Sequence, residues 1–227
     1  MISPPPPPDR PVDSRPEAAL GTVVRAWVHG WALSRNIATP VEVSGAFRLD
    51  VDTPGQLVRY VFTEFDPESL RRRAAALVTP GTWLKVCAGR EVVEGALPPP
   101  WQVGVQEFLM TTALRPPGAA PAVAGYRTET VTSGAATDVL VWAPDGERAA
   151  AGRVAVWGDA AVVDQVETRP EHRRRGLGAL VMDLLGAAAR ARGATRGVLV
   201  ATADGRALYR SLGWSLRSPV TPAWLPL

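Results

Sequence analysis

The residues whose types and spacing best fit a chemical role lie at Arg173–Ala179, which reads Arg-Arg-Arg-Gly-Leu-Gly-Ala. This segment follows a β-rich run that ends near Arg169, and it opens a long stretch with helical apolar spacing. A strand that turns through glycines into a helix leaves backbone N–H groups unpaired at the positive end of the helix dipole. A side chain at Gly176 or Gly178 would hold an anion away from these amides, and the arginines add charged donors. The segment therefore predicts a phosphate-binding turn.

Three sequence blocks around this turn resemble those of one family. The turn is similar to the (Q/R)-x-x-G-x-(G/A) block of the GNAT superfamily, the acyl-CoA-dependent N-acyltransferases. Val166–Pro170 resembles its V-x-P block, and Ala207–Trp214 resembles its A-L-Y-x-x-L-G-(F/W) block. The resemblance implies an acetyl-CoA-dependent N-acetyltransferase, with acetyl-CoA as co-substrate and no metal. The cofactor-binding residues that it implies are Val166 and Thr168 for the pantetheine arm, and Arg173, Arg174, Arg175, Gly176, Leu177, Gly178 and Ala179 for the pyrophosphate.

Tyr209 matches the tyrosine of the family, and the resemblance implies that it acts as the general acid. A phenol with a pKa near 10 stays neutral at pH 7 and can protonate the thiolate that leaves when an amine attacks a thioester. The alternative is a partly buried aromatic side chain whose hydroxyl bonds a backbone carbonyl.

Two carboxylates are candidates for the general base. The amine acceptor must lose a proton, either to a carboxylate or to a water molecule that a carboxylate orients. Glu167 is preferred and Asp164 is the second candidate. Three positions separate them on one strand, so we expect them on opposite faces, with only one facing the acceptor. Either could instead be a solvated or hydrogen-bonded carboxylate.

Sequence patterns in the C-terminal half predict the strands and helices that hold these residues in place. We expect strands at 126–131, 139–142, 152–157 and 161–168, a helix at 176–192 stopped by Gly193, a strand at 197–202 and a short helix at 206–212.

The wall of the acceptor pocket is the main departure from the family. GNAT folds usually place two helices between their first two strands, but only about seven residues separate Val131 from Val139, too few for an ordinary helix. The wall must come from elsewhere, and the helix around Trp27 and Trp31 or the strand ending near Met110 is available.

The N-terminal half repeats the same order of elements. We expect a helix at 17–35, strands at 47–51 and 58–65, a helix at 66–78 capped by Asp66, a strand at 83–88, a short helix at 90–97 and a strand at 102–113. The order suggests a degenerate internal duplication. The counterpart of the turn, at 68–73, has no glycine, so its amides should be capped and should bind no cofactor.

These elements predict an α/β (α+β) fold with a GNAT-like mixed, mostly antiparallel sheet flanked by helices. We expect a tandem of two GNAT-like halves. The segments are a disordered proline-rich arm at 1–16, a degenerate N-terminal half at 17–114, a linker at 115–121 and the acetyl-CoA-binding catalytic half at 122–227.

The amino-acid composition limits the kinds of partner and the cellular compartment that we expect. The 227 residues are 46% hydrophobic, which is ample for a core, and they contain neither an apolar run of membrane-spanning length nor a secretory signal, so we expect a cytoplasmic protein that binds no membrane. A net charge of +3 gives little support for nucleic-acid binding, although aminoacyl-tRNA stays open as an acceptor. We expect Cys87, the only cysteine, to be a buried strand thiol rather than a nucleophile.

The sequence therefore predicts transfer of an acetyl group to a primary amine of a small molecule or peptide by direct attack, without a covalent intermediate. The alternative is a catalytically silent acyl-CoA-binding sensor or scaffold module. Tyr209 and the turn favour catalysis, whereas the missing pocket helices and the uncertain base favour the alternative. Whether the chain forms a homodimer stays open.

Overall fold

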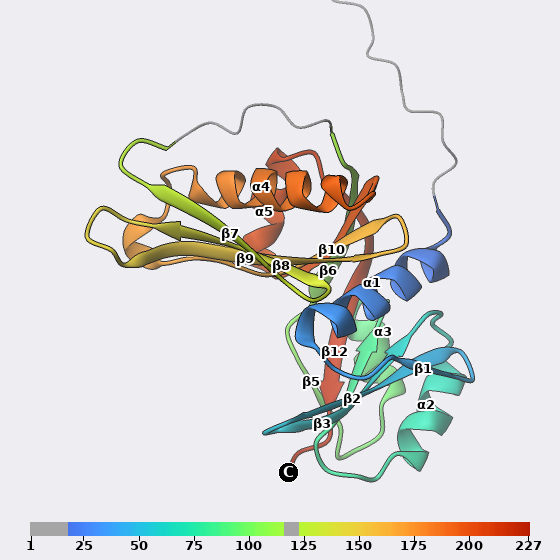
Figure 1. Ribbon diagram of the computed structural model, residues 1–227. Coiled ribbons are helices and arrows are strands. Elements are labelled where there is room, and N and C mark those ends of the chain that lie inside the picture. The colour runs from blue at the N-terminus through green and yellow to red at the C-terminus, as the bar shows by residue number, and fades with distance from the viewer. Residues whose placement is uncertain (1–17, 116–122) are drawn as a thin grey trace, which may run out of the picture.

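The computed structural model of the chain describes residues 18–115 and 123–227 (Figure 1). The predicted proline-rich arm at 1–16 lies outside the described residues, as does the predicted linker at 115–121 apart from Arg115.

The elements before the linker follow the predicted order. Two details differ: a short first strand was not expected, and the expected strand at 102–113 is interrupted. The elements are α1 (Leu20–Arg35), β1 (Val41–Val43), β2 (Ala46–Thr53), β3 (Gln56–Phe62), α2 (Pro67–Ala76), β4 (Thr82–Val86), α3 (Arg90–Ala96), β5 (Gln102–Val103) and β6 (Glu107–Ala113).

The elements after the linker confirm the predicted strands and helices, and they end in a last strand for which no bounds were predicted. They are β7 (Arg127–Ser133), β8 (Ala136–Trp142), β9 (Arg148–Trp157), β10 (Ala160–Thr168), a 3-10 turn η1 (Pro170–His172), α4 (Leu177–Ala191), β11 (Arg196–Ala201), α5 (Ala203–Ser211) and β12 (Ser215–Trp224). β7 and β8 form a hairpin with no helix between them, as the short spacing predicted.

One continuous sheet runs through both halves, with the strand order β1-β2-β3-β4-β12-β6-β11-β10-β9-β8-β7 and with β5 paired to β12. Most neighbouring strands are antiparallel, while β3 with β4 and β10 with β11 are parallel. A helix connects each parallel pair, as parallel strands require: α2 in the first and α4 in the second. The predicted fold class is therefore confirmed.

The last strand of each half lies among strands of the other half. β6 pairs with β11 through Phe108–Ala113, and β12 pairs with β6 through Ser215–Val220 and with β4 through Thr221–Trp224. The long β12 is visible in Figure 1 as the element that joins the two parts of the sheet. The internal duplication stays a prediction, and the two predicted halves share their central strands.

Helices α1 and α4 cover opposite faces of the strands that carry the candidate site (Figure 1). Ala160 and Val162 of β10 belong to the apolar cluster that includes α1, whereas Ala161 and Val163 belong to the cluster that includes α4. Neighbouring residues of a strand point to opposite faces, so the two helices sandwich β10. Gly30 lets α1 approach closely, because a Cβ there would lie 2.2 Å from Val162 Cγ2.

Helices α2 and α4 begin differently, as predicted for the two halves. The Asp66 carboxylate accepts a hydrogen bond from the Ser69 backbone N–H (2.7 Å), so a side chain caps α2. No side chain of the described residues caps α4, whose N-cap is Gly176. The helix that follows the predicted phosphate turn therefore keeps its first amides open.

Cys87 directly follows β4 and is 8% exposed, and burial raises the pKa of its thiol to about 12. Because the thiolate is the reactive form, we expect iodoacetamide to alkylate Cys87 about a thousandfold more slowly in the native protein than in denaturant, at a pH of about 8. Mass spectrometry of timed samples measures both rates. Alkylation of the native protein as fast as that of the denatured protein would contradict the buried position.

Candidate active site

The predicted phosphate turn has open backbone amides. The chain leaves β10 at Thr168, passes through η1 and turns into α4 with Gly176 at φ +81°, where an L side chain is strained. The first helical bond of α4 runs from the Leu180 N–H to the Gly176 carbonyl (3.1 Å). Within the described chain, no acceptor contacts the N–H groups of Leu177, Gly178 or Ala179. These amides form the kind of anion site that helix N-termini provide.

A cleft of about 790 Å³, called here the turn cleft, opens beside these amides. It is lined by all of the predicted cofactor residues except Arg175, by Glu167 and Tyr209, and by Thr202, Asp204, Gly205 and Leu208 of the α5 region. Arg175 points elsewhere: its guanidinium donates to the Tyr126 hydroxyl (2.9 Å) and to the Glu171 carbonyl (3.1 Å). Arg175 therefore braces the turn, while Arg173 and Arg174 face the cleft.

The start of α5 supplies the cleft residues that sequence reasoning missed. The helix begins at Ala203, not at the expected residue 206, because the Thr202 hydroxyl caps it by accepting from the Gly205 N–H (3.2 Å). The sequence pattern that could have revealed this helix start is a threonine at the end of a buried strand, three residues before a glycine. Gly178 lets α4 meet α5 closely, because a Cβ there would lie 2.9 Å from Leu208 Cδ2.

The parallel strands β10 and β11 separate beside the turn cleft. They pair only through Ala160–Val162 and Arg196–Val198, at the start of both strands. Beyond this point β11 stays paired with β6, and β10 stays paired with β9. Among the described residues, the inner edge of β10 at Val166–Thr168 therefore faces the cleft without a neighbouring strand, and its Thr168 carbonyl accepts from Arg173 Nε (3.3 Å).

Tyr209 lies in α5 at the wall of the turn cleft and is 8% exposed, with its ring 6.0 Å from that of Trp214. Burial raises the pKa of Tyr209 to about 12, and the charge of Asp164 adds to the increase. No group in residues 18–115 or 123–227 forms a hydrogen bond with its hydroxyl. Tyr209 is thus a neutral donor whose hydrogen is free for a ligand.

The two candidate bases lie on the same face of β10, so the expectation of opposite faces was wrong. The register pairs Asp164 with Arg153 and Glu167 with Ala151, so three steps on β10 oppose two on β9. This β-bulge, with Gln165 at φ +54°, adds one residue and reverses the alternation of side chains.

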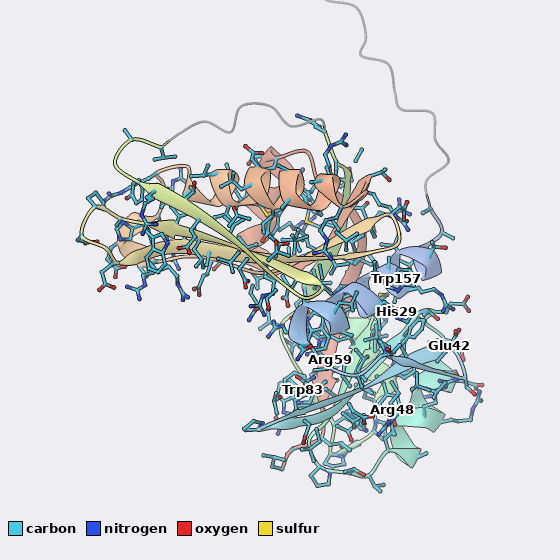
Figure 2. All side chains as sticks on the ribbon, in the orientation of Figure 1. His29, Glu42, Arg48, Arg59, Trp83 and Trp157 are labelled. Atoms are coloured by element: carbon cyan, nitrogen blue, oxygen red, sulfur yellow. The ribbon has the colours of Figure 1, made fainter. Side chains whose placement is uncertain are left out.

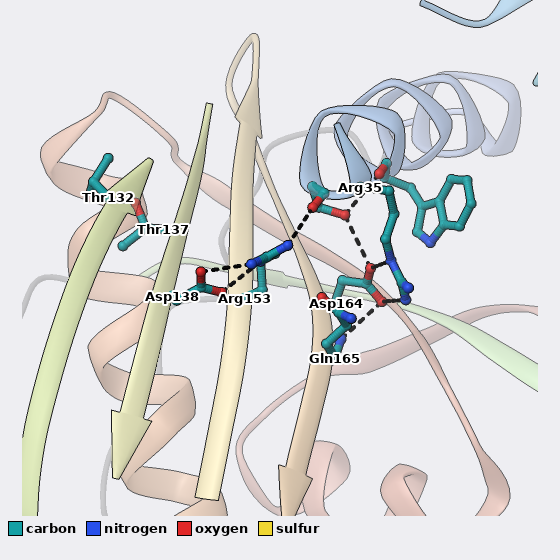
Figure 3. Close-up of polar contacts among 9 residues, drawn as sticks. Arg35, Thr132, Thr137, Asp138, Arg153, Asp164 and Gln165 are labelled. Carbon is teal, nitrogen blue, oxygen red and sulfur yellow. Dashed lines mark hydrogen bonds and ion pairs between the residues drawn. The ribbon is translucent and has the colours of Figure 1, made fainter. Parts of the chain in front are cut away.

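Asp164 is fully engaged by the end of α1 (Figure 3). Arg35 donates from Nε to Oδ2 (2.5 Å) and from Nη2 to Oδ1 (3.1 Å). Ser34 Oγ lies 3.1 Å from Oδ2, and the Gln165 backbone N–H donates to Oδ1 (2.9 Å). To take a proton from an amine, Asp164 would have to break this ion pair, so its geometry fits a positioning role better than that of a base.

Glu167 is the more accessible carboxylate. Its side chain is 56% exposed, it lines the turn cleft, and it accepts one hydrogen bond from Arg148 Nη2 through Oε1 (2.8 Å). The second oxygen, Oε2, accepts no hydrogen bond from the described residues. Glu167 can therefore take a proton directly or through water.

A second cavity, of about 450 Å³, lies between α1 and the central strands and is called here the α1 cavity. Both suggested sources of an acceptor wall contribute to it: α1 through its tryptophans, and β6 through Glu107, although Met110 itself is fully buried. The lining residues are Trp27, Trp31, Arg35, Ile37, Val51, Thr53, Gln56, Arg59, Lys85, Glu107 and Val200.

The charged side chains of the α1 cavity were also missed from the sequence. Lys85 Nζ donates to Glu107 Oε2 (2.5 Å), and the Arg59 guanidinium lies 4.0 Å from the centre of the Trp31 ring. A sequence pattern could have revealed Arg59 and Lys85: each is a single cation inside an apolar strand run, Val58–Phe62 or Thr82–Val86, where a lone charge is unusual.

Comparisons with known families and with known proteins show what this chain is similar to. Residues 111–214, a little under half of the chain, match the model of the "Acetyltransferase (GNAT) family". A search of curated proteins found no match. No helix in the described residues has both the length and the apolar character that a membrane span needs.

Solved structures are similar over nearly the whole chain. A GCN5-related N-acetyltransferase from Kribbella flavida aligns with a TM-score of 0.64 at 21% identity, over 92% of this chain and 96% of that one. A GNAT-family protein from Novosphingobium aromaticivorans aligns with a TM-score of 0.58 at 20% identity, over 91% and 99%. A GCN5-related N-acetyltransferase from Sphaerobacter thermophilus aligns with a TM-score of 0.56 at 13% identity, over 79% and 76%. At these identities the likeness concerns the fold, and it includes the N-terminal half.

Proposed function

We propose that this chain, whose residues 111–214 form a GNAT acetyltransferase domain, transfers an acetyl group from acetyl-CoA to a primary amine of a small molecule or peptide. One observation carries the proposal: the turn cleft brings the open amides of α4, the free edge of β10 and the Tyr209 hydroxyl to one place. The proposal includes a location in the cytoplasm. Formation of a homodimer and an aminoacyl-tRNA acceptor both stay open.

The residues present fit acetyl-CoA. The amides of Leu177–Ala179 and the side chains of Arg173 and Arg174 would hold its pyrophosphate, and the edge of β10 at Val166 and Thr168 would hold its pantetheine arm. When bound, acetyl-CoA supplies a thioester carbonyl that an amine can attack. No group of His, Cys, Asp and Glu side chains in the described residues is arranged to hold a metal ion.

The proton transfers follow from the two side chains at the cleft. A C–N bond forms and the C–S bond breaks, while Glu167 or a water that it orients takes the proton from the amine. Tyr209 donates a hydrogen bond to the sulfur as negative charge builds there. Because burial raises the pKa of Tyr209 to about 12, its hydroxyl keeps its proton at neutral pH and is available, as the general acid, to the departing thiolate.

Thiol release with a panel of primary amines tests this function. We expect acetyl-CoA to lose its acetyl group at a rate that depends on the amine, and a chromogenic thiol reagent to report the free thiol without interference from buried Cys87. Calorimetric titration of acetyl-CoA in the same buffer gives the dissociation constant. Tight binding with no amine-dependent release across the panel would favour the silent acyl-CoA-binding module instead.

A further inference from the structure

Arg59 is a partly buried cation that forms no ion pair within the described residues. It extends from β3 into the α1 cavity (Figure 2), stacks 4.0 Å from the Trp31 ring, and donates from Nη2 to Gln56 Oε1 (3.0 Å). No carboxylate of the described residues lies within ion-pair distance of its guanidinium. Burial lowers the pKa of Arg59 to about 10, so the side chain is still charged at neutral pH.

Two hydrogen-bond donors in the cavity wall are unused. Arg59 Nε and Gln56 Nε2 are both buried, and neither has an acceptor in residues 18–115 or 123–227. Because the Gln56 oxygen already accepts from Arg59, its amide nitrogen is the group left over. Buried donors are almost always paired, so two unused donors beside one cation point to a ligand that only accepts hydrogen bonds.

The charges around the α1 cavity leave one positive charge in excess. Arg35 pairs with Asp164, and Lys85 pairs with Glu107, which leaves Arg59. A single anionic group of one charge balances the cavity, and a carboxylate provides both the charge and the acceptors. A phosphate dianion would leave a negative charge buried beside Glu107.

The α1 cavity and the turn cleft meet the same two strands where they separate. Val200 of β11 lines the cavity, and Thr202, two residues further on, lines the cleft. On the other strand, Arg35 of the cavity binds Asp164, and β10 reaches the cleft at Val166. A molecule held in the cavity can therefore reach toward the cleft.

We propose that the α1 cavity binds the carboxylate of the acceptor through Arg59 and Gln56, so that the preferred acceptors are amines that also carry a carboxylate, of amino-acid or dipeptide size. The apolar part of such an acceptor packs on Trp27 and Trp31. A cavity of about 450 Å³ suits a ligand of this size. This assignment of a substrate class rests on the proposed acetyl transfer, whereas the carboxylate site itself does not.

Matched acceptors test the substrate class. We expect kcat/KM to be at least about tenfold higher for phenylalanine than for phenethylamine, which lacks only the carboxylate. Arg59→Met keeps an unbranched apolar stem on Trp31 and should remove this preference. Arg48→Met on the neighbouring strand β2, where Arg48 pairs with exposed Asp50, is the control and should keep it. Gln56→Leu removes one donor and should reduce the preference by a smaller factor.

A binding measurement separates failure of the site from failure of the proposed function. Calorimetric titration uses 3-phenylpropionate, a carboxylate without an amine, and we expect Arg59→Met to weaken its binding at least about tenfold and Arg48→Met to leave it unchanged. Binding that depends on Arg59, without turnover of any amine, upholds the site and overturns the acetyl transfer. Equal turnover of phenylalanine and phenethylamine, with no Arg59-dependent binding of the probe, overturns the site and leaves the acetyl transfer standing.

Discussion

Replacing Tyr209 with Phe is expected to lower kcat about 10- to 100-fold and to leave the dissociation constant of acetyl-CoA nearly unchanged. The hydroxyl is invoked only where charge builds on the departing sulfur, so its loss is felt in the transition state. A hydrogen bond to a charged group is worth about 1.5 to 3 kcal/mol, which corresponds to this range of rates. The ring stays packed beside Trp214, so the fold should not change.

Steady-state turnover and calorimetry on the same preparations measure the effect. Tyr60→Phe on β3 is the matched control, because it removes a phenol hydroxyl outside the turn cleft, and it should keep wild-type kcat. A change in kcat of less than about threefold in the Tyr209 variant would show that its hydroxyl has only a structural role.

Replacing Gly176 with Val is expected to remove most of the rise in melting temperature that acetyl-CoA gives. In the wild type, ligand at about 100 times its dissociation constant stabilises by about 2.7 kcal/mol, or roughly 5 to 10 °C for a chain of this size. Space beside Gly176 is open, with no atom within 4 Å of a Cβ built there, so the new side chain would stand beside the free amides of α4.

Gly193→Val controls for backbone strain. Gly193 follows α4 at φ +90° and, like Gly176 at φ +81°, has nothing within 4 Å of a built Cβ, so both variants carry similar strain. Both should melt below the wild type, but Gly193→Val should keep the full shift with acetyl-CoA. Differential scanning fluorimetry with and without ligand measures both. Equal ligand shifts in the two variants would mean that acetyl-CoA binds away from the turn.

Local patterns predicted most of the elements and the turn. Asp66 before Pro67 marked the start of α2, and Gly193 marked the end of α4, because capping depends on residues within one turn of the helix end. The turn at Arg173–Ala179 was likewise recognisable, because its amides are opened by its own glycines and not by distant contacts.

Long-range contacts explain what the sequence could not predict. The exchange of β6 and β12 depends on pairing between strands about a hundred residues apart, which leaves no local pattern. A single bulge residue, Gln165, reversed the expected faces of the two carboxylates. The ion pair between Asp164 and Arg35, which lie 129 positions apart, likewise leaves no local pattern.

The α1 cavity is the clearest case of this limit. Its cations come from α1, β3 and β4, each of which looks like an ordinary amphipathic or buried element when taken alone. Only the packing of α1 against the sheet shows that Arg59 faces a cavity and forms no ion pair with the residues that the structure describes. The proposed carboxylate site, unlike the predicted phosphate turn, therefore depends on residues from distant parts of the chain.

Mass spectrometry that follows a heavy-isotope acetyl group from acetyl-CoA, in the presence of phenylalanine and simpler amines, tests the proposed acetyl transfer directly. Acetyl transfer at the turn cleft predicts the label on the amine nitrogen, with one free thiol for each acetylated amine. Label recovered as acetate, or no thiol released beyond the buffer rate, would contradict it.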